Sequence, residues 1–501
     1  MKTILPFIII VFTCVFAETV FAELKLPSGA DRRPNLSLDP FERAREANRS
    51  VTPREEAPAP QPATPHETPP DEPAVINNQQ EQVLEPISQE EMRIQSGDPV
   101  SADNSQASTA TPIPPQPEAD EPEEAFSYEI AATVDSFTLT AGGLAGSVDG
   151  IPEDSYETGK IGFFGTIDFV AELKPGGFDL WDNGTFFLLA SVIAGTAPAV
   201  GDFHGISGVY GGGNTMRIVE LWYEHEFPFS HSAILFGLHD FNGDFYVTEY
   251  AGTLLNGSFG MGTIIGNGGN ASTFPTPTTG LRLKTQLNDI SYLQAAIYDG
   301  AASEEAYDKL IEVKFDDTDG FFLATEAGIV KNEPGDPNGY FKVGLGAWYL
   351  RQDQFGYPDG SAEETPIFED NPKPGNNGYY FIAESSIGEN LGIFFKHGRG
   401  RKDYNQFAQY YATGLSYQGV LPSRGEDVLS LGLVHTRQSA DYLAQSGVTA
   451  FVAETTYEIT YTTQITDWLM VQPDVQYITQ PSMSPDIPSA LVLGLRLQAV
   501  Y

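Results

Sequence analysis

One short segment carries polar and aromatic side chains whose types and spacing could recognise a solute. In an extended strand, successive side chains point to opposite faces. One face of residues 216–227 would then carry Glu220, Trp222, Glu224 and Glu226, and the other Val219, Leu221, Tyr223 and Phe227. A tryptophan beside carboxylates can stack on the apolar face of a sugar ring while the carboxylates bind its hydroxyls. Alternatively, Trp222 belongs to an interfacial girdle or to internal packing.

Three further segments show the same division into a polar and an apolar side. Their polar positions are Glu454, Thr456, Glu458, Thr460, Gln472, Asp474, Gln476, Arg496 and Gln498. Arg282 and Lys284 add positive charge in another segment, where they alternate with leucines. Opposed charges across a water-filled constriction create a transverse field that selects polar solutes. The alternative is that these groups form salt bridges that only brace the interior.

Signals for an enzyme or a cofactor site are weak. The histidines show no metal-ligand spacing; they are His66, His204, His225, His231, His239, His397 and His435. No Gly-x-Ser-x-Gly motif is present. Residues 240–244 (DFNGD) loosely resemble a calcium loop but lack its downstream glutamate. We therefore predict no catalytic residue, no metal and no cofactor, with a hydrolase built around His225 as an alternative.

The end of the chain indicates the elements that would position these side chains. From Ala490 to Tyr501 a leucine or alanine occupies every second position, and Arg496 and Gln498 lie between them. A strand of about 9–11 residues with one apolar face can cross a bilayer when it is tilted. We therefore expect an all-β fold, a transmembrane antiparallel β-barrel.

Alternating segments recur from Phe126 to the end of the chain, separated by turn sequences. Seventeen strands are predicted to begin near Tyr128, Gly159, Thr185, Met216, Ala233, Thr279, Ser291, Asp308, Phe321, Phe341, Gly378, Leu391, Ala408, Val428, Val452, Trp468 and Ser489. Bacterial barrels have an even number of strands. We therefore expect sixteen strands, within a range of 16–18, with the error either near Asp308 or between Arg351 and Asn377.

Short turns alternate with long connections, as they do between the two ends of outer-membrane barrels. The long connections are residues 194–214, 241–278 and 437–451. The second is unusually apolar for a loop, since it contains Phe245, Tyr246, Tyr250, Leu254, Leu255 and Phe259. We expect it to fold inward and to narrow the pore.

The first 125 residues differ from the rest. Residues 1–22 have the charged start, the apolar core and the small-residue exit of a secretory signal peptide. The only cysteine, Cys14, lies in this segment. Residues 23–125 are rich in Pro and Glu and show no apolar period, which predicts a disordered periplasmic linker. This linker could contact peptidoglycan or another envelope component.

The charge balance argues against nucleic acid as a partner. The net charge is −41, and phosphate binding requires clustered Lys and Arg. Of 68 acidic and 27 basic residues, 22 and 9 precede residue 126, which leaves 46 and 18 in residues 126–501. An acidic lumen would favour cations or neutral solutes. An acidic surface without such a role is the alternative.

Eight sequence blocks together resemble the carbohydrate-selective outer-membrane porin family, the OprB-like porins. They are IVELWY (218–223), YAGTLLNGSFG (250–260), TGLRL (279–283), AIYDG (296–300), GVLPSRGEDV (419–428), AETTYEITY (453–461), QPDVQYI (472–478) and ALVLGLRL (490–497). The resemblance covers nearly all of residues 126–501. It implies a sixteen-stranded barrel in the outer membrane, with residues 241–278 at its constriction, through which small sugars diffuse passively. The lead-in before residue 126 is longer than in the family.

We therefore predict an outer-membrane sugar porin whose barrel spans residues 126–501 and is surrounded by lipid. The expected lumen residues that contact sugar are Glu220, Trp222, Arg282, Glu454, Glu458, Gln472, Asp474 and Arg496. Two alternatives stay open. One is a general diffusion pore that favours cations, and the other is a structural anchor that acts through residues 23–125.

Overall fold

The computed structural model describes residues 125–144, 158–198, 200–209, 214–266, 271–300, 310–311, 320–351, 375–402, 405–446 and 452–501. The segments predicted as signal peptide (1–22) and linker (23–125) lie outside the described residues, except for Ala125. No helix in the described ranges is long and apolar enough to cross a membrane.

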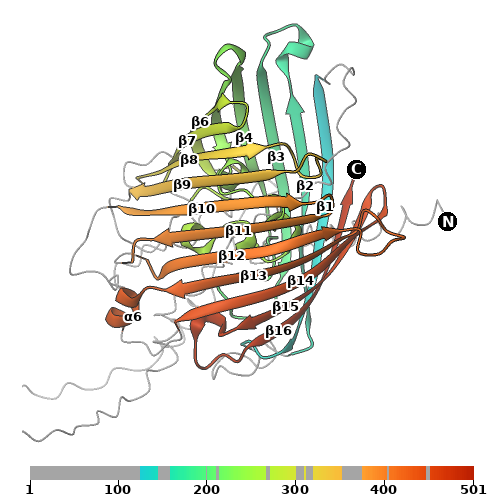
Figure 1. Cartoon of the computed structure of the whole chain (residues 1–501), viewed down its shortest axis with the longest axis vertical. Coiled ribbons are helices and arrows are strands. Elements are labelled where there is room, and N and C mark those ends of the chain that lie inside the picture. Colours follow the sequence, from blue (N-terminus) through green and yellow to red (C-terminus); the bar gives the residue numbers. More distant parts are fainter. Residues whose placement is uncertain are drawn as a thin grey trace, which may run out of the picture. The chain divides into compact units, whose positions relative to one another are not determined.

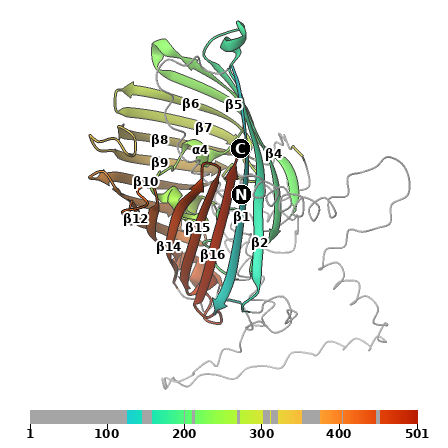
Figure 2. The same cartoon turned by 90° about the vertical axis from the view of Figure 1, so that its right-hand side faces the viewer.

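Sixteen antiparallel strands form one closed barrel (Figures 1 and 2). They are β1 (Phe126–Ala141), β2 (Ile161–Leu173), β3 (Gly184–Thr196), β4 (Thr215–Phe227), β5 (Ser232–His239), β6 (Thr278–Asn288), β7 (Ser291–Asp299), β8 (Phe321–Lys331), β9 (Phe341–Arg351), β10 (Asn376–Ile387), β11 (Leu391–Gly400), β12 (Phe407–Gln418), β13 (Val428–Gln438), β14 (Ala453–Thr466), β15 (Leu469–Thr479) and β16 (Ala490–Val500). Each strand pairs with its neighbours in sequence, and β1 closes the ring by pairing with β16, for example Asp135 with Arg496. The expected fold class is therefore confirmed.

Sixteen of the seventeen predicted strands begin within two residues of the predicted position. The exception is the strand near Asp308, a residue that lies outside the described ranges. Because β7 pairs directly with β8, from Ser291–Ile329 to Asp299–Phe321, the ring has no place for a strand between them. The expectation of sixteen strands is confirmed.

The alternation within each strand separates a lipid-facing surface from the interior. On β16, Leu493, Leu495 and Leu497 are 45%, 38% and 38% exposed, whereas the alternating Arg496 and Gln498 are only 8% and 5% exposed. Leucines that remain exposed on a barrel's outer face are the side chains a bilayer would cover. The outward side of β16 is therefore the apolar one, as predicted.

The alternation predicted for β4 is wrong at one position. Ala190 pairs with Ile218 and Leu189 with Glu220, so Val219 is an extra residue in a β-bulge. Val219 is fully buried in a cluster with Ile193 and Phe274, whereas it was expected beside Leu221 on the outer side. Because the bulge adds one residue, the alternation of inward and outward side chains changes at Val219. Glu220 and Trp222 point inward, as predicted.

The ends of the barrel differ in their connections. Connections that follow even-numbered strands are turns, with the short helices η2 (Pro175–Phe178) and η3 (Pro228–Ser230). Those that follow odd-numbered strands include the longer loops and carry α4 (Phe241–Asp244), η4 (Ala251–Thr253), η5 (Gly257–Phe259), α5 (Thr263–Gly266), α6 (Ala440–Ser446) and η7 (Pro481–Met483). We call residues 197–214, between β3 and β4, L2, and residues 240–277, between β5 and β6, L3.

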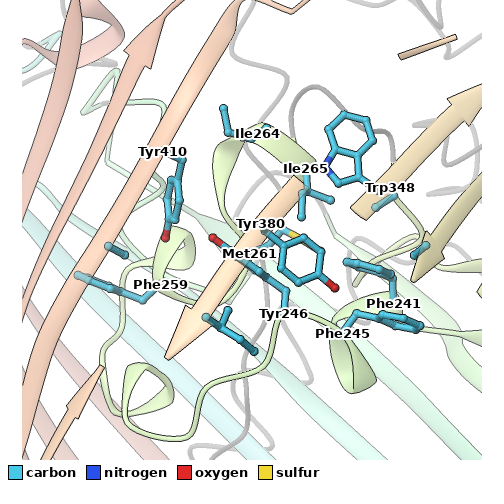
Figure 3. Packing of buried hydrophobic residues seen from close by; sticks show 14 of the residues in the cluster. Phe241, Phe245, Tyr246, Phe259, Met261, Ile264, Ile265, Trp348, Tyr380 and Tyr410 are labelled. Carbon is cyan, nitrogen blue, oxygen red and sulfur yellow. The ribbon is translucent and has the colours of Figure 1, made fainter. Parts of the chain in front are cut away.

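L3 lies inside the barrel and packs against the inner wall, as predicted. In Figures 1 and 2 its green ribbon, which contains α4 and α5, is surrounded by the strands. Phe241, Phe245, Tyr246 and Phe259 are at most 1% exposed and form one cluster with inward side chains of β7–β13 (Figure 3). The apolar character of this loop thus reflects a buried position within the barrel.

Glycines on the inner wall make room for the bulky side chains of L3. A Cβ atom at Gly392 of β11 would lie 2.1 Å from the Tyr250 ring, and one at Gly432 of β13 would lie 2.4 Å from the Phe259 ring. Interiors are close-packed, so neither position has space for a methyl group without a shift of the loop. The wall and L3 are therefore complementary in shape.

Candidate functional site

The inner wall holds L3 through buried carboxylates that accept its backbone N–H groups. Glu326 of β8 accepts hydrogen bonds from the Tyr246 N–H (2.9 Å), the Tyr380 and Tyr292 hydroxyls (both 2.8 Å) and Gln294 Nε2 (3.1 Å). A buried polar group costs free energy unless it is paired, and bonds to a charged acceptor are strong. Tyr292, Tyr380 and Gln294 are side chains of the wall and fix Glu326 in place, so that it anchors the first part of L3 through the Tyr246 N–H.

Two further carboxylates continue this row along L3. Glu384 of β10 accepts from the Tyr250 N–H at 3.1 Å. Glu458 of β14 accepts from the Leu255 N–H at 2.5 Å and the Asn256 N–H at 3.0 Å. The loop is thus held by its main chain at successive points around the wall.

Wall side chains that donate hydrogen bonds complete the attachment. Lys396 of β11 donates to the carbonyl oxygens of Phe259 (2.9 Å) and Gly260 (2.5 Å), and its ammonium lies 4.0 Å from the centre of the Tyr246 ring. Gln472 of β15 donates to the Thr253 carbonyl at 2.9 Å. Wall donors meet loop carbonyls and wall acceptors meet loop N–H groups, so these main-chain groups of L3 are paired with the wall.

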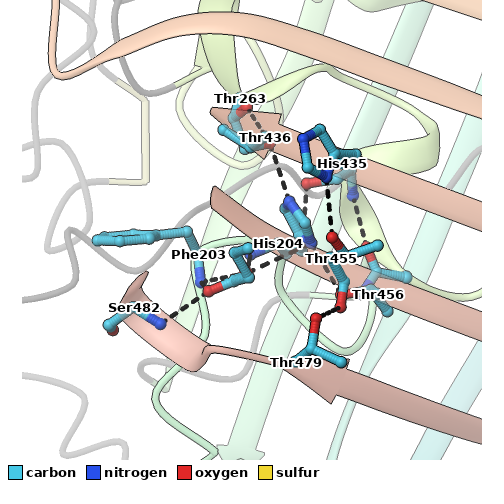
Figure 4. Close-up of polar contacts among 12 residues, drawn as sticks. Phe203, His204, Thr263, His435, Thr436, Thr455, Thr456, Thr479 and Ser482 are labelled. Atoms are coloured by element: carbon cyan, nitrogen blue, oxygen red, sulfur yellow. Dashed lines mark hydrogen bonds and ion pairs between the residues drawn. The ribbon is translucent and has the colours of Figure 1, made fainter. Parts of the chain in front are cut away.

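L2 is fixed in the same way by Glu454 of β14, and Figure 4 shows Phe203, His204 and Ser482 among the polar contacts of this region. Its carboxylate accepts from the Phe203 N–H (2.9 Å), the His204 N–H (3.1 Å) and the Ser482 N–H (2.7 Å). The His204 ring lies 2.8 Å from the hydroxyls of both Thr456 and Thr436. Glu454 therefore joins L2 to the segment between β15 and β16.

Burial sets the charge states in L2. Burial lowers the pKa of His204 to about 3, which keeps the imidazole neutral near pH 7. Burial raises the pKa of the neighbouring Asp202 to about 6, against hydrogen bonds from backbone N–H groups, which lower it. Acid therefore acts on the docking of L2 in opposite ways through the two groups: protonation of His204 opposes docking, and protonation of Asp202 favours it.

L2 and L3 also contact each other. The Gly208 N–H donates to the Leu255 carbonyl at 2.8 Å, and the Gly257 N–H donates to the Gly205 carbonyl at 3.0 Å. Arg496 of β16 binds Asp135 of β1 with two hydrogen bonds of 2.7 Å, which join the two strands that close the barrel. Arg496 lies 3.2 Å from the hydroxyl of Ser207 in L2. The two loops and the closing strands form one connected structure.

An ion-pair cluster marks the point where L3 leaves the wall. Arg282 of β6 binds Glu224 of β4 at 2.6 Å and Asp244 of L3 at 2.8 Å. Asp244 also lies 3.2 Å from His239 Nε2 and 3.6 Å from Lys284 Nζ. Burial alone would raise the pKa of Asp244, but the hydrogen bond to His239 and the charge of Arg282 lower it overall. Asp244 is therefore ionised and balanced by its neighbours.

An aromatic pair lies beside this cluster. The rings of Phe187 on β3 and Trp222 on β4 stack at 4.7 Å with an interplanar angle of 12°. Trp222 Nε1 donates to Glu220 at 2.9 Å, and the His239 ring meets the Trp222 ring edge-on at 6.3 Å. Phe187 and Trp222 are half-buried, so part of this platform is accessible to a solute.

The eight predicted site residues all point inward but fall into two groups. Glu220, Trp222 and Arg282 gather at the start of L3. The other five lie on β14–β16 and are at most 8% exposed; they are Glu454, Glu458, Gln472, Asp474 and Arg496. Of these, Asp474 accepts a hydrogen bond from Gln476 Nε2 at 2.9 Å. The second group contacts loops and wall, and its contact with sugar stays a prediction.

Several residues of the interior were not predicted from the sequence as site residues. They are Phe187, Asp135, His239, Asp244, Glu326, Glu384 and Lys396. A charged residue at an inward position among apolar neighbours, such as Lys396 between Phe394 and Gly398, is a signal that could have identified some of them. His225 points outward, 3.0 Å from the Tyr223 hydroxyl, away from the interior cluster. The calcium-like segment caps α4 instead, since Asp240 accepts from the Asn242 N–H at 2.7 Å.

The comparisons with known proteins agree with this geometry. Residues 179–501 match the model of the carbohydrate-selective porin, OprB family. The chain belongs to this family. Porin B of Pseudomonas aeruginosa is 23% identical over 332 residues, 61% of this chain and 72% of that protein. The high-pH structure of Pseudomonas putida OprB has a TM-score of 0.61 at 19% identity and covers 75% of this chain and 94% of that chain.

These matches establish the class and the location of the protein. It is an outer-membrane porin of the carbohydrate-selective family, and its barrel is a sugar diffusion channel. The expected family and location are confirmed. The resemblance to the solved structure confirms the fold.

Proposed function

We propose that small sugars pass the constriction along the wall formed by β3–β6 and use Phe187 and Trp222 as a stacking platform. The observation that carries this proposal is the aromatic pair beside Glu224 and Arg282. A sugar ring needs an apolar surface for its C–H face and polar groups for its hydroxyls, and this arrangement offers both. The opposite wall is covered by L2 and L3.

Within this proposal, the five buried residues on β14–β16 act by holding loops and closing the barrel. Glu454, Glu458 and Gln472 would position L2 and L3 and so set the width of the passage. Mono- or small oligosaccharides would diffuse down their gradient, and no bond would be made or broken. The charged groups near Asp244 would orient the hydroxyls of the passing ring.

Sugar block of ion current in planar bilayers tests the platform. Trp222→Ala should lower the apparent sugar affinity by roughly 2–10-fold, because an aromatic contact contributes about 0.5–1.5 kcal/mol. Trp222→Phe should retain part of the affinity. The matched control is Trp181→Ala, since Trp181 lies outside the barrel, where its Nε1 donates to the Tyr223 hydroxyl at 2.9 Å. Unchanged block in Trp222→Ala would refute the platform.

Two other roles are tested separately. The excess of acidic residues in residues 126–501 supports a preference for cations, which reversal potentials in a salt gradient would detect. Residues 23–125 could contact peptidoglycan or another envelope component. Deletion of residues 23–125 should leave sugar uptake intact and weaken the envelope if this second role is correct. Liposome swelling with sugars of increasing size would define the size limit.

A further inference from the structure

Positive charge is concentrated on one part of the outer face. Arg399 of β11, Gln409 of β12 and Arg437 of β13 lie directly opposite one another in register. Both arginines are exposed. They share the outward phase of their strands with Ile393, Phe395 and Leu431, which are 38%, 40% and 38% exposed. A chain of net charge −41 thus places two neighbouring guanidinium groups on its lipid-facing surface.

The guanidinium groups of Arg399 and Arg437 have no partner within the described ranges. Both residues pair with neighbouring strands through their backbones, but neither side chain makes a hydrogen bond or an ion pair with a described residue. None of the outward positions on β9–β14 is occupied by Asp or Glu. Two paired strand spacings place the two Cα atoms about 10 Å apart, with Gln409 between them. The row therefore presents donors that an anion from outside the chain can bind.

A second row lies two residues farther along the same strands. His397, Tyr411 and His435 are opposite one another, and the rings of His397 and Tyr411 stack at 4.6 Å. Tyr379 of β10, which is 44% exposed, is paired with Arg399. Amphipathic rings of this kind are typical of the boundary between hydrocarbon and headgroups. The arginine row therefore lies at headgroup level.

The topology identifies which leaflet this is. Arg399 and Arg437 lie at the ends of β11 and β13, which are odd-numbered strands, so they share the end of the barrel from which L2 and L3 arise. In outer-membrane barrels the longer connections are extracellular. The row therefore faces the outer leaflet.

We propose that Arg399, Gln409 and Arg437 bind the phosphate of an anionic, phosphorylated glycolipid of the outer leaflet. Arginine forms paired hydrogen bonds with phosphate, and Gln409 adds a neutral donor. The apolar side chains below the row would contact the acyl chains of the same molecule. Charge complementarity at headgroup level above an apolar wall favours a lipid over a soluble anion.

Native mass spectrometry of the full-length protein in detergent tests the site with lipopolysaccharide as the probe. Arg399→Ala/Arg437→Ala should lower its affinity at least about tenfold, because hydrogen bonds to charged groups are strong. Arg399→Lys/Arg437→Lys should lose less affinity for the lipid, since lysine keeps the positive charge but lacks the paired N–H donors of the guanidinium group. Gln409→Glu, which leaves both arginines in place, should also weaken binding. The matched control is Lys174→Ala/Lys331→Ala, which removes two positive charges at the other end of the barrel.

Three results would overturn the proposal. The first is equal lipid binding by the double alanine variant and the unaltered protein, when both migrate as folded barrels in unheated gels. The second is equal binding of lipopolysaccharide whose lipid A has been dephosphorylated. The third is displacement of the lipid by millimolar inorganic phosphate, which would show a site for a free anion.

Discussion

Glu326 allows a quantitative test of how the wall holds L3. Glu326→Ala leaves four donors without their acceptor, namely the Tyr246 N–H, the Tyr292 and Tyr380 hydroxyls and Gln294 Nε2. We assume that water replaces two of these bonds and that two donors stay unpaired, at a cost of about 1.5 kcal/mol each. The attached state of L3 is then destabilised by about 3 kcal/mol relative to the detached state. Since about 1.4 kcal/mol is a factor of ten, detachment of L3 should become about 100-fold more frequent.

Thiol labelling measures this detachment directly. The chain has one cysteine, Cys14, so a Cys14→Ser background leaves an introduced cysteine as the only thiol. Ala251 of L3 is 1% exposed, and Ala251→Cys should react with a maleimide only when the loop leaves the wall. Labelling should be about 100-fold faster with Glu326→Ala and intermediate with Glu326→Gln, whose amide oxygen keeps part of the bonding.

The control and the refuting result follow from the same structure. Glu426→Ala removes an exposed carboxylate in the turn before β13 and should leave the labelling rate unchanged. Single-channel recordings should show larger and noisier conductance for Glu326→Ala, because the loop no longer narrows the pore continuously. Unchanged labelling in a folded Glu326→Ala barrel would show that shape complementarity, not the carboxylates, holds L3.

Two further predictions concern shape and pH. Gly432→Ala should displace L3 and raise the Ala251→Cys labelling rate, because its Cβ would lie 2.4 Å from Phe259, whereas Gly425→Ala, with no neighbour within 4 Å, should not. The pKa of His204 is lowered to about 3 and that of Asp202 is raised to about 6, so below pH 6 the first weakens docking of L2 as pH falls and the second strengthens it. As pH falls from 6 to 4, labelling at Val209→Cys should therefore rise by nearly tenfold per pH unit in Asp202→Asn, where only His204 titrates. It should fall by about fivefold per unit in His204→Gln, where only Asp202 titrates, and parallel slopes in the two variants would contradict these assignments.

The barrel itself could be predicted from the sequence because the pattern that specifies it is local. Apolar residues such as Leu495 alternate with polar residues such as Arg496, and this pattern can be read without knowing the rest of the chain. A period of two predicts a strand with one face toward lipid. The extra strand near Asp308 came from the same local pattern, without knowledge that Ser291 pairs directly with Ile329. Whether an alternating segment becomes a strand of the barrel therefore depends on strand pairing, which the local pattern does not show.

The roles of the inward residues could not be predicted in the same way. Alternation shows that Glu458 points inward, but it does not distinguish an inner face that meets water from one that meets a loop. The partners of Glu458 are Leu255 and Asn256, more than 200 positions away in the chain. The apolar content of residues 241–278 did predict that the loop packs inside. The position at which the loop packs depends on wall glycines such as Gly392 and Gly432. Their role becomes visible only in the assembled barrel, where they face the side chains of L3.

The net charge of the chain is a poor guide to the charge that a solute meets. Glu326, Glu384, Glu454 and Glu458 lie inside the barrel, yet each is at most 4% exposed and bonded to a loop. Around Asp244 lie the cations Arg282 and Lys284 and the further carboxylates Glu224, Glu220 and Asp240. Carboxylates and cations of both signs beside an aromatic platform offer hydrogen-bond partners and an apolar face to a neutral, hydroxyl-rich solute. The excess acidity of the chain therefore does not itself argue against the passage of sugars.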